Sequence, residues 1–253
     1  MKEIIKSFVK KYYKILLTFT LCGLVGGFLI GLYLLDSYPA EIREQIIAQG
    51  IDGVALGIIS GIQYAGYGLV LGAVGIVLAK RIGLWRDEIV FEKKPIILGL
   101  IWGVIGGVAL IGFDLLWFGR EVVAIGESYL VKPSVAYILG SIILGGVVEE
   151  VMLRLFMMSL AAFLLLKIFK NCNIEAALII ANVVSAMLFA AGHLPVTDIL
   201  FGLTPLVIFR CFLLNGGVGL AFGWLYRKHG IQYAMIAHAF CHVVSKLIWI
   251  LFI

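Results

Sequence analysis

The chain alternates between long apolar runs and short polar segments. Seven of the runs are long enough to cross a bilayer as a helix, which takes about 17 to 25 residues. They cover residues 15–35, 54–78, 95–118, 136–166, 175–192, 204–226 and 231–253. Proline disrupts a helix interior, so we expect the fifth helix to stop before Pro195. The pattern predicts an all-α fold, a polytopic membrane helical bundle of about seven transmembrane helices that forms one integral membrane domain over residues 1–253.

The composition agrees with a membrane protein. The 253 residues are 62% hydrophobic and 14% charged, with a formal net charge of +5. This excess of apolar residues excludes an ordinary soluble domain. The basic residues fall in short clusters between the apolar runs, so no nucleic-acid-binding patch is expected. We therefore expect the lipid bilayer, and no nucleic acid, as a partner of a multi-pass protein that lies in the plasma membrane if its source is prokaryotic.

Lysine and arginine are distributed unevenly among the loops. Five precede the first run, five lie between the second and third, two follow the fourth and two follow the sixth, against one, two and none in the opposite loops. Such residues accumulate on the cytoplasmic side, which predicts a cytoplasmic N-terminus and an exterior C-terminus. Lys246 is an exception, because it lies inside the last run and either snorkels outward or faces the bundle.

Three ionisable residues interrupt the fourth run: Glu149, Glu150 and Arg154. A charge at bilayer depth costs at least about 2.5 to 3.5 kcal/mol on insertion scales, and such residues usually line a site or a cavity. Residues four apart share a helix face, so we expect Glu150 to pair with Arg154. Glu149 then keeps a free carboxyl group that is available as a general base. The alternative is that the ion pair only fixes helix register.

Three of the four histidines lie in or at the ends of later runs: His193, His238 and His242. His238 and His242 are four apart and share a helix face, and His193 follows Phe189 by one turn. Together with Glu149 these histidines can activate a water molecule, since imidazoles orient water, hold an oxyanion or bind a metal. The sequence leaves two mechanisms open. Either no metal takes part, or Glu149, His193, His238 and His242 hold a divalent metal such as Zn²⁺ with one position open for water.

Other known routes to intramembrane cleavage leave different motifs. A zinc-binding helix carries His-Glu-x-x-His, and a nucleophilic serine often sits in Gly-x-Ser-x-Gly. Neither motif occurs in this chain, and Asp114 is not set in a Gly-x-Gly-Asp context. Zincin-type, serine-type and aspartyl-type sites are therefore disfavoured.

The order of the motifs along the chain is informative. Three motifs follow one another on the late runs: Glu149-Glu150-x-x-x-Arg154, Phe189-x-x-x-His193 and His238-x-x-x-His242. In this order they resemble the CPBP family of intramembrane endopeptidases, the CAAX proteases and bacteriocin-processing enzymes that include the Ras-converting CAAX endopeptidase. The resemblance covers residues 136–245, which we expect to form the catalytic region.

The resemblance implies roles for these residues. Glu149 and His193 would activate the water, and His238 and His242 would bind the carbonyl oxygen of the substrate. Supporting roles fall to three further residues: Glu150, Arg154 and Phe189. His242 departs from the family pattern, because members more often carry asparagine at that position.

The implied reaction is hydrolysis of a peptide bond in a membrane-associated or lipidated peptide or protein, which includes prenylated and membrane-anchored substrates. Two other classes stay open. In a proton- or ion-coupled transporter the same ionisable residues would form a relay, and broken helices or repeated halves would be expected. A catalytically silent bacteriocin-immunity or binding protein could use the same scaffold.

Helix geometry restricts how the motifs can meet. At about 1.5 Å per residue, His238 lies about 12 Å from the basic turn at residues 229–230, and Glu149 lies about 27 Å from Lys167. The two residues share one layer only if the fourth helix projects beyond the membrane or tilts strongly. We expect the projection, with the site in the cytoplasmic half.

Overall fold

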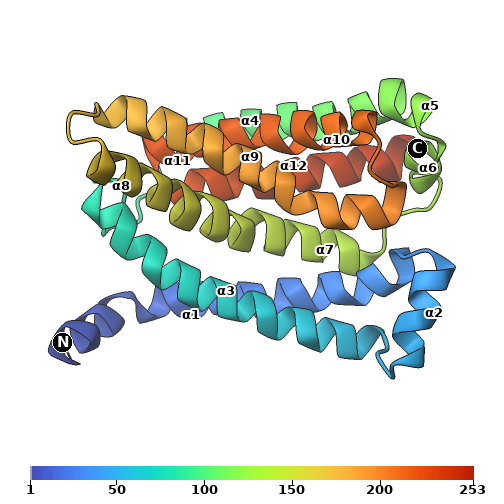
Figure 1. Ribbon diagram of the computed structural model, residues 1–253, viewed down its shortest axis with the longest axis horizontal. Coiled ribbons are helices and arrows are strands. Elements are labelled where there is room, and N and C mark those ends of the chain that lie inside the picture. Colours follow the sequence, from blue (N-terminus) through green and yellow to red (C-terminus); the bar gives the residue numbers. More distant parts are fainter. Residues whose placement is uncertain (1) are drawn as a thin grey trace.

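The computed structural model describes residues 2–253, and Met1 lies outside that range. All regular secondary structure in the described range is helical (Figure 1). Within residues 2–253, seven segments are long and apolar enough to cross a membrane. The predicted all-α bundle with seven membrane-spanning segments is confirmed.

The bounds of the spans are as follows, with η marking a π-helix. The first is α1 (Lys2–Ser37), the second is α3 (Gly53–Arg81), and the third is α4 (Lys93–Phe113) with η1 (Asp114–Phe118) and α5 (Gly119–Glu121). The fourth joins α7 (Val135–Ile143), η2 (Leu144–Glu149), η3 (Val151–Met158) and α8 (Ser159–Ile168). The fifth is α9 (Ile174–Phe201), the sixth joins α10 (Pro205–Cys211), η4 (Phe212–Gly216) and α11 (Gly217–His229), and the seventh is α12 (Ile231–Phe252). Two short helices, α2 (Ala40–Ala48) and α6 (Val123–Ser128), lie in connections.

Two of the predicted helix limits were wrong. Helix α9 does not stop before Pro195 but continues through it to Phe201. Proline removes only one backbone donor, and membrane helices tolerate it where nearby groups satisfy the freed carbonyl. The helix is followed instead by Gly202, whose φ of 70° suits glycine. Helix α1 begins at Lys2 rather than near residue 15, because the lysine-rich segment before the first apolar run is also helical.

Glycines allow two pairs of helices to pack closely. A Cβ atom on Gly31 of α1 would lie only 2.6 Å from the Cα atom of Gly57 on α3. On α4, a Cβ atom on Gly103 would lie 2.8 Å from the carbonyl oxygen of Ala237 on α12. Small residues spaced four apart let membrane helices approach in this way. The glycine repeats therefore hold α1 against α3 and α4 against α12.

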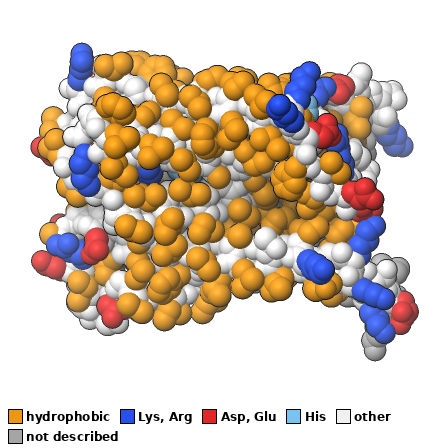
Figure 2. Space-filling model, turned by 180° about the vertical axis from the view of Figure 1, so that it is seen from behind, with side chains coloured by type: hydrophobic (Ala, Val, Ile, Leu, Met, Phe, Trp, Pro, Cys, Tyr) orange, Lys and Arg blue, Asp and Glu red, His pale blue; other side chains and the backbone are white. Residues whose placement is uncertain are grey.

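The connections sort to two ends of the bundle. The N-terminus and the connections α3–α4, α8–α9 and α11–α12 lie at the left in Figure 1, and α2, α5, α6 and the C-terminus lie at the right. Figure 2 shows a hydrophobic belt between two ends where most of the charged side chains on this face gather. Connections at two charged ends, with a hydrophobic belt between them, agree with an integral multi-pass membrane protein. Which end faces the cytoplasm stays a prediction.

At one end the fourth and fifth spans reach beyond the sixth and seventh spans. The hairpin of α8 and α9 extends further along the long axis than the connection between α11 and α12 (Figure 1). The glutamates of the fourth span therefore come level with the histidines of α12, although they lie at different distances from their own loops.

Candidate active site

Both glutamates lie in a stretch that winds as a π-helix. Glu149 ends η2, Glu150 follows it, and η3 begins at the next residue. π-Helical turns are rare and frequently occur at functional sites. A glycine within η2 brings this stretch against α12, since a Cβ atom on Gly146 would lie 2.7 Å from the Cβ atom of Ala239. The segment that carries the glutamates thus faces the helix that carries two of the histidines.

Glu150 and Arg154 form a completely buried ion pair. Both side chains are 0% exposed, and Arg154 Nη1 lies 3.0 Å from Glu150 Oε1. Arg154 Nη2 donates a hydrogen bond of 3.1 Å to the carbonyl oxygen of Gly219. The guanidinium also lies 4.6 Å from the ring centre of Phe189 and 5.6 Å from that of Phe222. The pair predicted from the four-residue spacing is present, and the surrounding side chains fix its position.

His238 connects the two glutamates. Its Nδ1 atom lies 2.8 Å from Glu150 Oε1 in a hydrogen bond, and its Nε2 atom lies 3.8 Å from Glu149 Oε2. An ionised carboxylate only accepts, so Nδ1 donates to Glu150, and Nε2 of a neutral ring is left as an acceptor. The side chain of His238 is 4% exposed and that of Glu149 is 23% exposed. Four side chains thus lie in a row of contacts: Glu149, His238, Glu150 and Arg154. Glu149 is the accessible end of this row.

Aromatic rings hold the imidazole of His238 on both faces. Phe222 stacks on it with ring centres 4.8 Å apart, and His242 stacks with centres 5.0 Å apart. Gly145 lies at the edge of the two imidazoles, because a Cβ atom there would be 2.5 Å from His242 Nε2 and 3.2 Å from His238 Nε2. Only glycine at this position leaves both Nε2 atoms undisturbed.

His193 lies beside this cluster and is linked to it through Phe189. Its Nδ1 atom lies 2.8 Å from the carbonyl oxygen of Phe189, one turn earlier in α9. The ring of Phe189 meets His193 edge-on at 4.8 Å and His238 edge-on at 5.6 Å. The carbonyl fixes the tautomer, so Nε2 of His193 is an acceptor when the ring is neutral. Within residues 2–253, no ion pair joins His193 to Glu149 or Glu150.

The donor set does not fit a metal ion in this arrangement. Over the described part of the chain, no three residues among His, Cys, Asp and Glu are grouped so that they could hold one. This includes the predicted zinc ligands Glu149, His193, His238 and His242. Structural and catalytic zinc sites need at least three protein ligands.

The site contains two residues that sequence reasoning did not identify. Phe222 is 0% exposed and stacks on His238, and Gly145 lies beside both imidazoles. Phe222 is one of 16 phenylalanines, so composition could not single it out. Gly145 lies four residues before Glu149, and a glycine about one helical turn from buried charges was the available signal of close approach.

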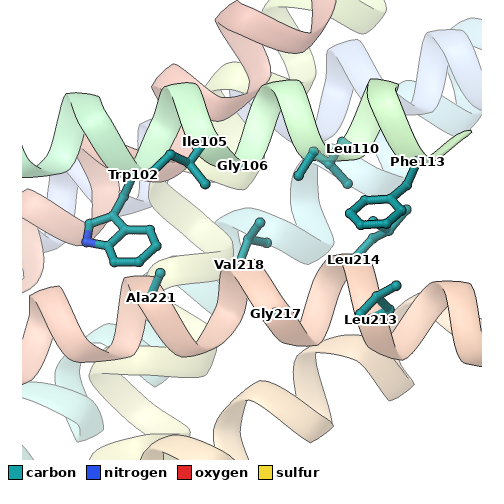
Figure 3. Close-up of a pocket in the computed structure, with 11 residues that line it drawn as sticks. Trp102, Ile105, Gly106, Leu110, Phe113, Leu213, Leu214, Gly217, Val218 and Ala221 are labelled. Carbon is teal, nitrogen blue, oxygen red and sulfur yellow. The ribbon is translucent and has the colours of Figure 1, made fainter. Parts of the chain in front are cut away.

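The bundle also contains an apolar groove. It has an empty volume of about 500 Å³ and runs between α4 and the segment η4–α11 (Figure 3). Its walls are apolar and include Trp102, Phe113 and Val218. It contains none of the glutamates or the three clustered histidines. The groove is therefore separate from the glutamate–histidine cluster.

The fold and the cluster define a class: a multi-pass helical membrane protein with glutamates and histidines gathered between its late helices. Comparison with family models finds one similarity. Residues 131–244 match the model described as Rce1-like, type II CAAX prenyl endopeptidase Rce1-like. The match covers the region that carries the three motifs, which confirms the resemblance to the CPBP and CAAX proteases. No curated protein and no solved structure matches the chain significantly.

Proposed function

We propose that this protein is an intramembrane endopeptidase that hydrolyses a peptide bond with a water molecule activated by Glu149. One observation carries the proposal. His238 lies between Glu150, at 2.8 Å, and Glu149, at 3.8 Å, inside a helical membrane bundle. The family match supports protease activity in general terms, and the assignment of individual residues is our own.

In the proposed reaction the water lies between Glu149 and Nε2 of His238. Two acceptors about 3.8 Å apart can both take a hydrogen bond from one water molecule. Glu149 removes a proton as the water oxygen attacks the scissile carbonyl carbon, and Glu149 later gives that proton to the leaving nitrogen. His238 orients the water, and Glu150 holds His238 in the required tautomer. One water is consumed and no other reactant is needed.

The oxyanion needs a hydrogen-bond donor, and we assign it to His242. The neutral ring of His238 has its only N–H directed at Glu150, so it does not donate to the substrate. His242 stacks on His238, and its Nε2 atom lies beside that of His238 at Gly145, so we assign the donor role to the Nε2–H of a neutral His242 ring, whose enclosed Nδ1 then carries no proton. The resemblance assigns His193 to the water as well, but a water molecule donates only two hydrogen bonds, and Glu149 and His238 accept both. Nε2 of His193 is an acceptor in the neutral ring, so we assign His193 no direct hydrogen bond to this water. In this proposal His238 orients the water, whereas the resemblance implies that it binds the carbonyl oxygen of the substrate.

We propose that the reaction proceeds without a metal, because the donor groups do not converge as a ligand set. The test is the metal content of active purified protein and the response of its activity to chelator and then zinc. We expect full activity in metal-free protein. Stoichiometric metal, with activity lost on chelation and restored by zinc, would overturn this part of the proposal.

The proposed substrate is a peptide or protein held at the membrane. A site enclosed by hydrophobic spans receives most readily a segment that is already anchored to the bilayer by lipid or by its own apolar residues. A prenylated substrate belongs to this class. We place the protein in the plasma membrane if its source is prokaryotic.

The test is cleavage of a labelled peptide library by purified protein in lipid vesicles. We expect cleavage by the wild type and none by Glu149→Gln. His229→Ala is the matched control, since His229 contacts Trp224 and Tyr233 away from the cluster. Its activity should equal that of the wild type. Cleavage by Glu149→Gln at the rate of the wild type would contradict the proposal.

A further inference from the structure

The loop between α3 and α4 exposes three consecutive apolar side chains. Ile89, Val90 and Phe91 are 45%, 52% and 61% exposed, and α4 begins two residues later at Lys93. Contiguous exposed apolar residues with polar neighbours mark contacts with a partner or with a membrane. The loop lies at the same end of the bundle as the N-terminus (Figure 1). The apolar run is therefore available to a partner outside the bundle.

Hydrogen bonds hold this loop against the first turn of α12. The carbonyl oxygen of Val90 accepts a hydrogen bond of 3.0 Å from Gln232 Nε2 and one of 2.9 Å from the hydroxyl of Tyr233. The backbone N–H of Glu92 donates to the same hydroxyl at 2.8 Å. Because the backbone is held on both sides of Phe91, the exposure of its ring is fixed by the fold.

Basic side chains flank the apolar run. Arg86, Lys93 and Lys94 are exposed, and within the described residues none of them forms an ion pair with a carboxylate. Asp87 in the same loop is already bound by lysines of α1 and α3. The three cations beside the apolar run are thus free to meet negative charges from outside.

The two ends of the bundle differ in charge. Thirteen lysines and arginines stand against five acidic residues in the segments at the end with the loop, which are residues 3–14, 80–94, 167–175 and 227–230. Three stand against seven in the segments at the opposite end, which are residues 36–52, 119–134 and 198–204. A negatively charged surface is therefore attracted to the end that carries the loop.

We infer that the α3–α4 loop binds anionic phospholipid of the leaflet at this end. The apolar run enters the boundary between headgroups and acyl chains, while Arg86, Lys93 and Lys94 contact phosphate oxygens. A phospholipid provides both an apolar chain and a negative charge. It is favoured over a protein partner because the run directly precedes α4, and so lies where a membrane-spanning segment begins. This site does not depend on the proposed peptidase function.

The test maps cross-links to the wild type in phosphatidylcholine vesicles that contain a trace of photoactivatable phosphatidylglycerol or photoactivatable phosphatidylcholine. A basic residue near an anionic surface contributes about fivefold in affinity, so three contribute about 100-fold. We expect phosphatidylglycerol to label residues 86–94 about 10- to 100-fold more strongly than phosphatidylcholine does. An ionic strength of about 1 M limits electrostatic attraction to about 3 Å and should weaken this preference.

Two pairs of lysines give matched variants. Lys93→Gln with Lys94→Gln should lower labelling of the loop by phosphatidylglycerol about 25-fold, because two of the three cations are lost. Lys10→Gln with Lys14→Gln removes the same charge from the same end but outside the loop, so labelling of residues 86–94 should stay at the wild-type level. An equal loss in both double variants would overturn the inference, since the lipid would then respond only to total charge.

A third variant tests the apolar half of the site. Ile89→Ser with Phe91→Ser keeps the backbone hydrogen bonds to α12 and should lower labelling of the loop by both lipids. Equal labelling of residues 86–94 by the two lipids in the wild type would overturn the anionic selectivity. Absence of label from either lipid in this segment would overturn the site itself and leave a protein partner as the occupant of the apolar run.

Discussion

At the scale of single residues, Glu149 and Glu150 are neighbours in sequence with different surroundings. Glu150 is 0% exposed and lies against both Arg154 and His238. Glu149 keeps 23% of its side chain exposed, and its Oε2 atom lies 3.8 Å from His238 Nε2. Two adjacent carboxylates can therefore have different functions, because one is enclosed and paired and the other is accessible.

This difference predicts different consequences for the two glutamine variants. Glu149→Gln should remove activity but leave the melting temperature close to that of the wild type. Glu150→Gln leaves the charge of Arg154 buried without its partner, which typically costs about 3–5 kcal/mol, so its melting temperature should fall clearly. Thermal unfolding in detergent measures both. Equal destabilisation by the two substitutions would contradict the different roles assigned to Glu149 and Glu150.

Gly145 gives a second prediction at this scale. An alanine there places its Cβ atom 2.5 Å from His242 Nε2, so the two stacked imidazoles must move. A shift of about 1 Å in a catalytic group costs about 100-fold in rate, and we expect a fall in kcat of that order for Gly145→Ala. Gly112→Ala is the control, because nothing lies within 4 Å of its Cβ position. Unchanged kcat in Gly145→Ala would show that the histidines do not act from their present positions.

The sequence predicted part of this site for a clear physical reason. The pairing of Glu150 with Arg154 follows from helix periodicity, which is local. The bridging position of His238 depends on how α12 meets the fourth span, and the stacking of Phe222 depends on α11. Such contacts join residues far apart in the chain, and spacing alone does not contain them.

At the scale of helices, the number of spans was predicted better than their ends or their winding. Apolar runs report where a helix is buried in lipid, but α1 also continues through a polar, lysine-rich segment. Hydropathy does not distinguish an α-helix from the π-helical winding at the glutamates. The π-helical stretch lies where the fourth span packs closely against α12, and this contact is not encoded in a local pattern.

A cluster around Asp87 ties the first helix to the loop before α4. Lys11 Nζ lies 2.8 Å from Asp87 Oδ2, and the hydroxyl of Tyr12 donates to Oδ1 at 2.5 Å. The hydrogen bond from Lys11 is the main reason why the pKa of Asp87 falls below its ordinary 3.8, followed by that from Tyr12. Lys80 adds a weaker contribution of the same sign.

The lowered pKa of Asp87 predicts a pH-dependent stability. A carboxyl group with a lower pKa in the folded state stabilises the fold above its ordinary pKa, and this contribution is lost as the pH falls below it. Asp87→Asn should therefore have a lower melting temperature than the wild type from pH 7 to about pH 4, and the gap should narrow at lower pH. Thermal unfolding at a series of pH values measures the gap. A gap that stays constant below pH 4 would contradict the ion-pair account.

At the scale of the whole molecule, the loops alternate between the two ends as a seven-span topology requires (Figure 1). The lysine and arginine bias predicts that the end with the N-terminus is cytoplasmic. Reporter fusions after Gly50, Lys94, Gly126, Asn173 and Ile253 should therefore read outside, inside, outside, inside and outside. An intracellular reading at Ile253 would mean that the orientation or the number of spans is wrong.

The central claim is that Glu149 activates water for peptide hydrolysis, and product analysis in water labelled with heavy oxygen tests it most directly. The purified wild type should release a peptide with one heavy oxygen in its new carboxyl group, and Glu149→Gln should release none over the same time. Both proteins must first show the same melting temperature, so that the comparison concerns chemistry alone. Labelled product from Glu149→Gln at the rate of the wild type would contradict the account.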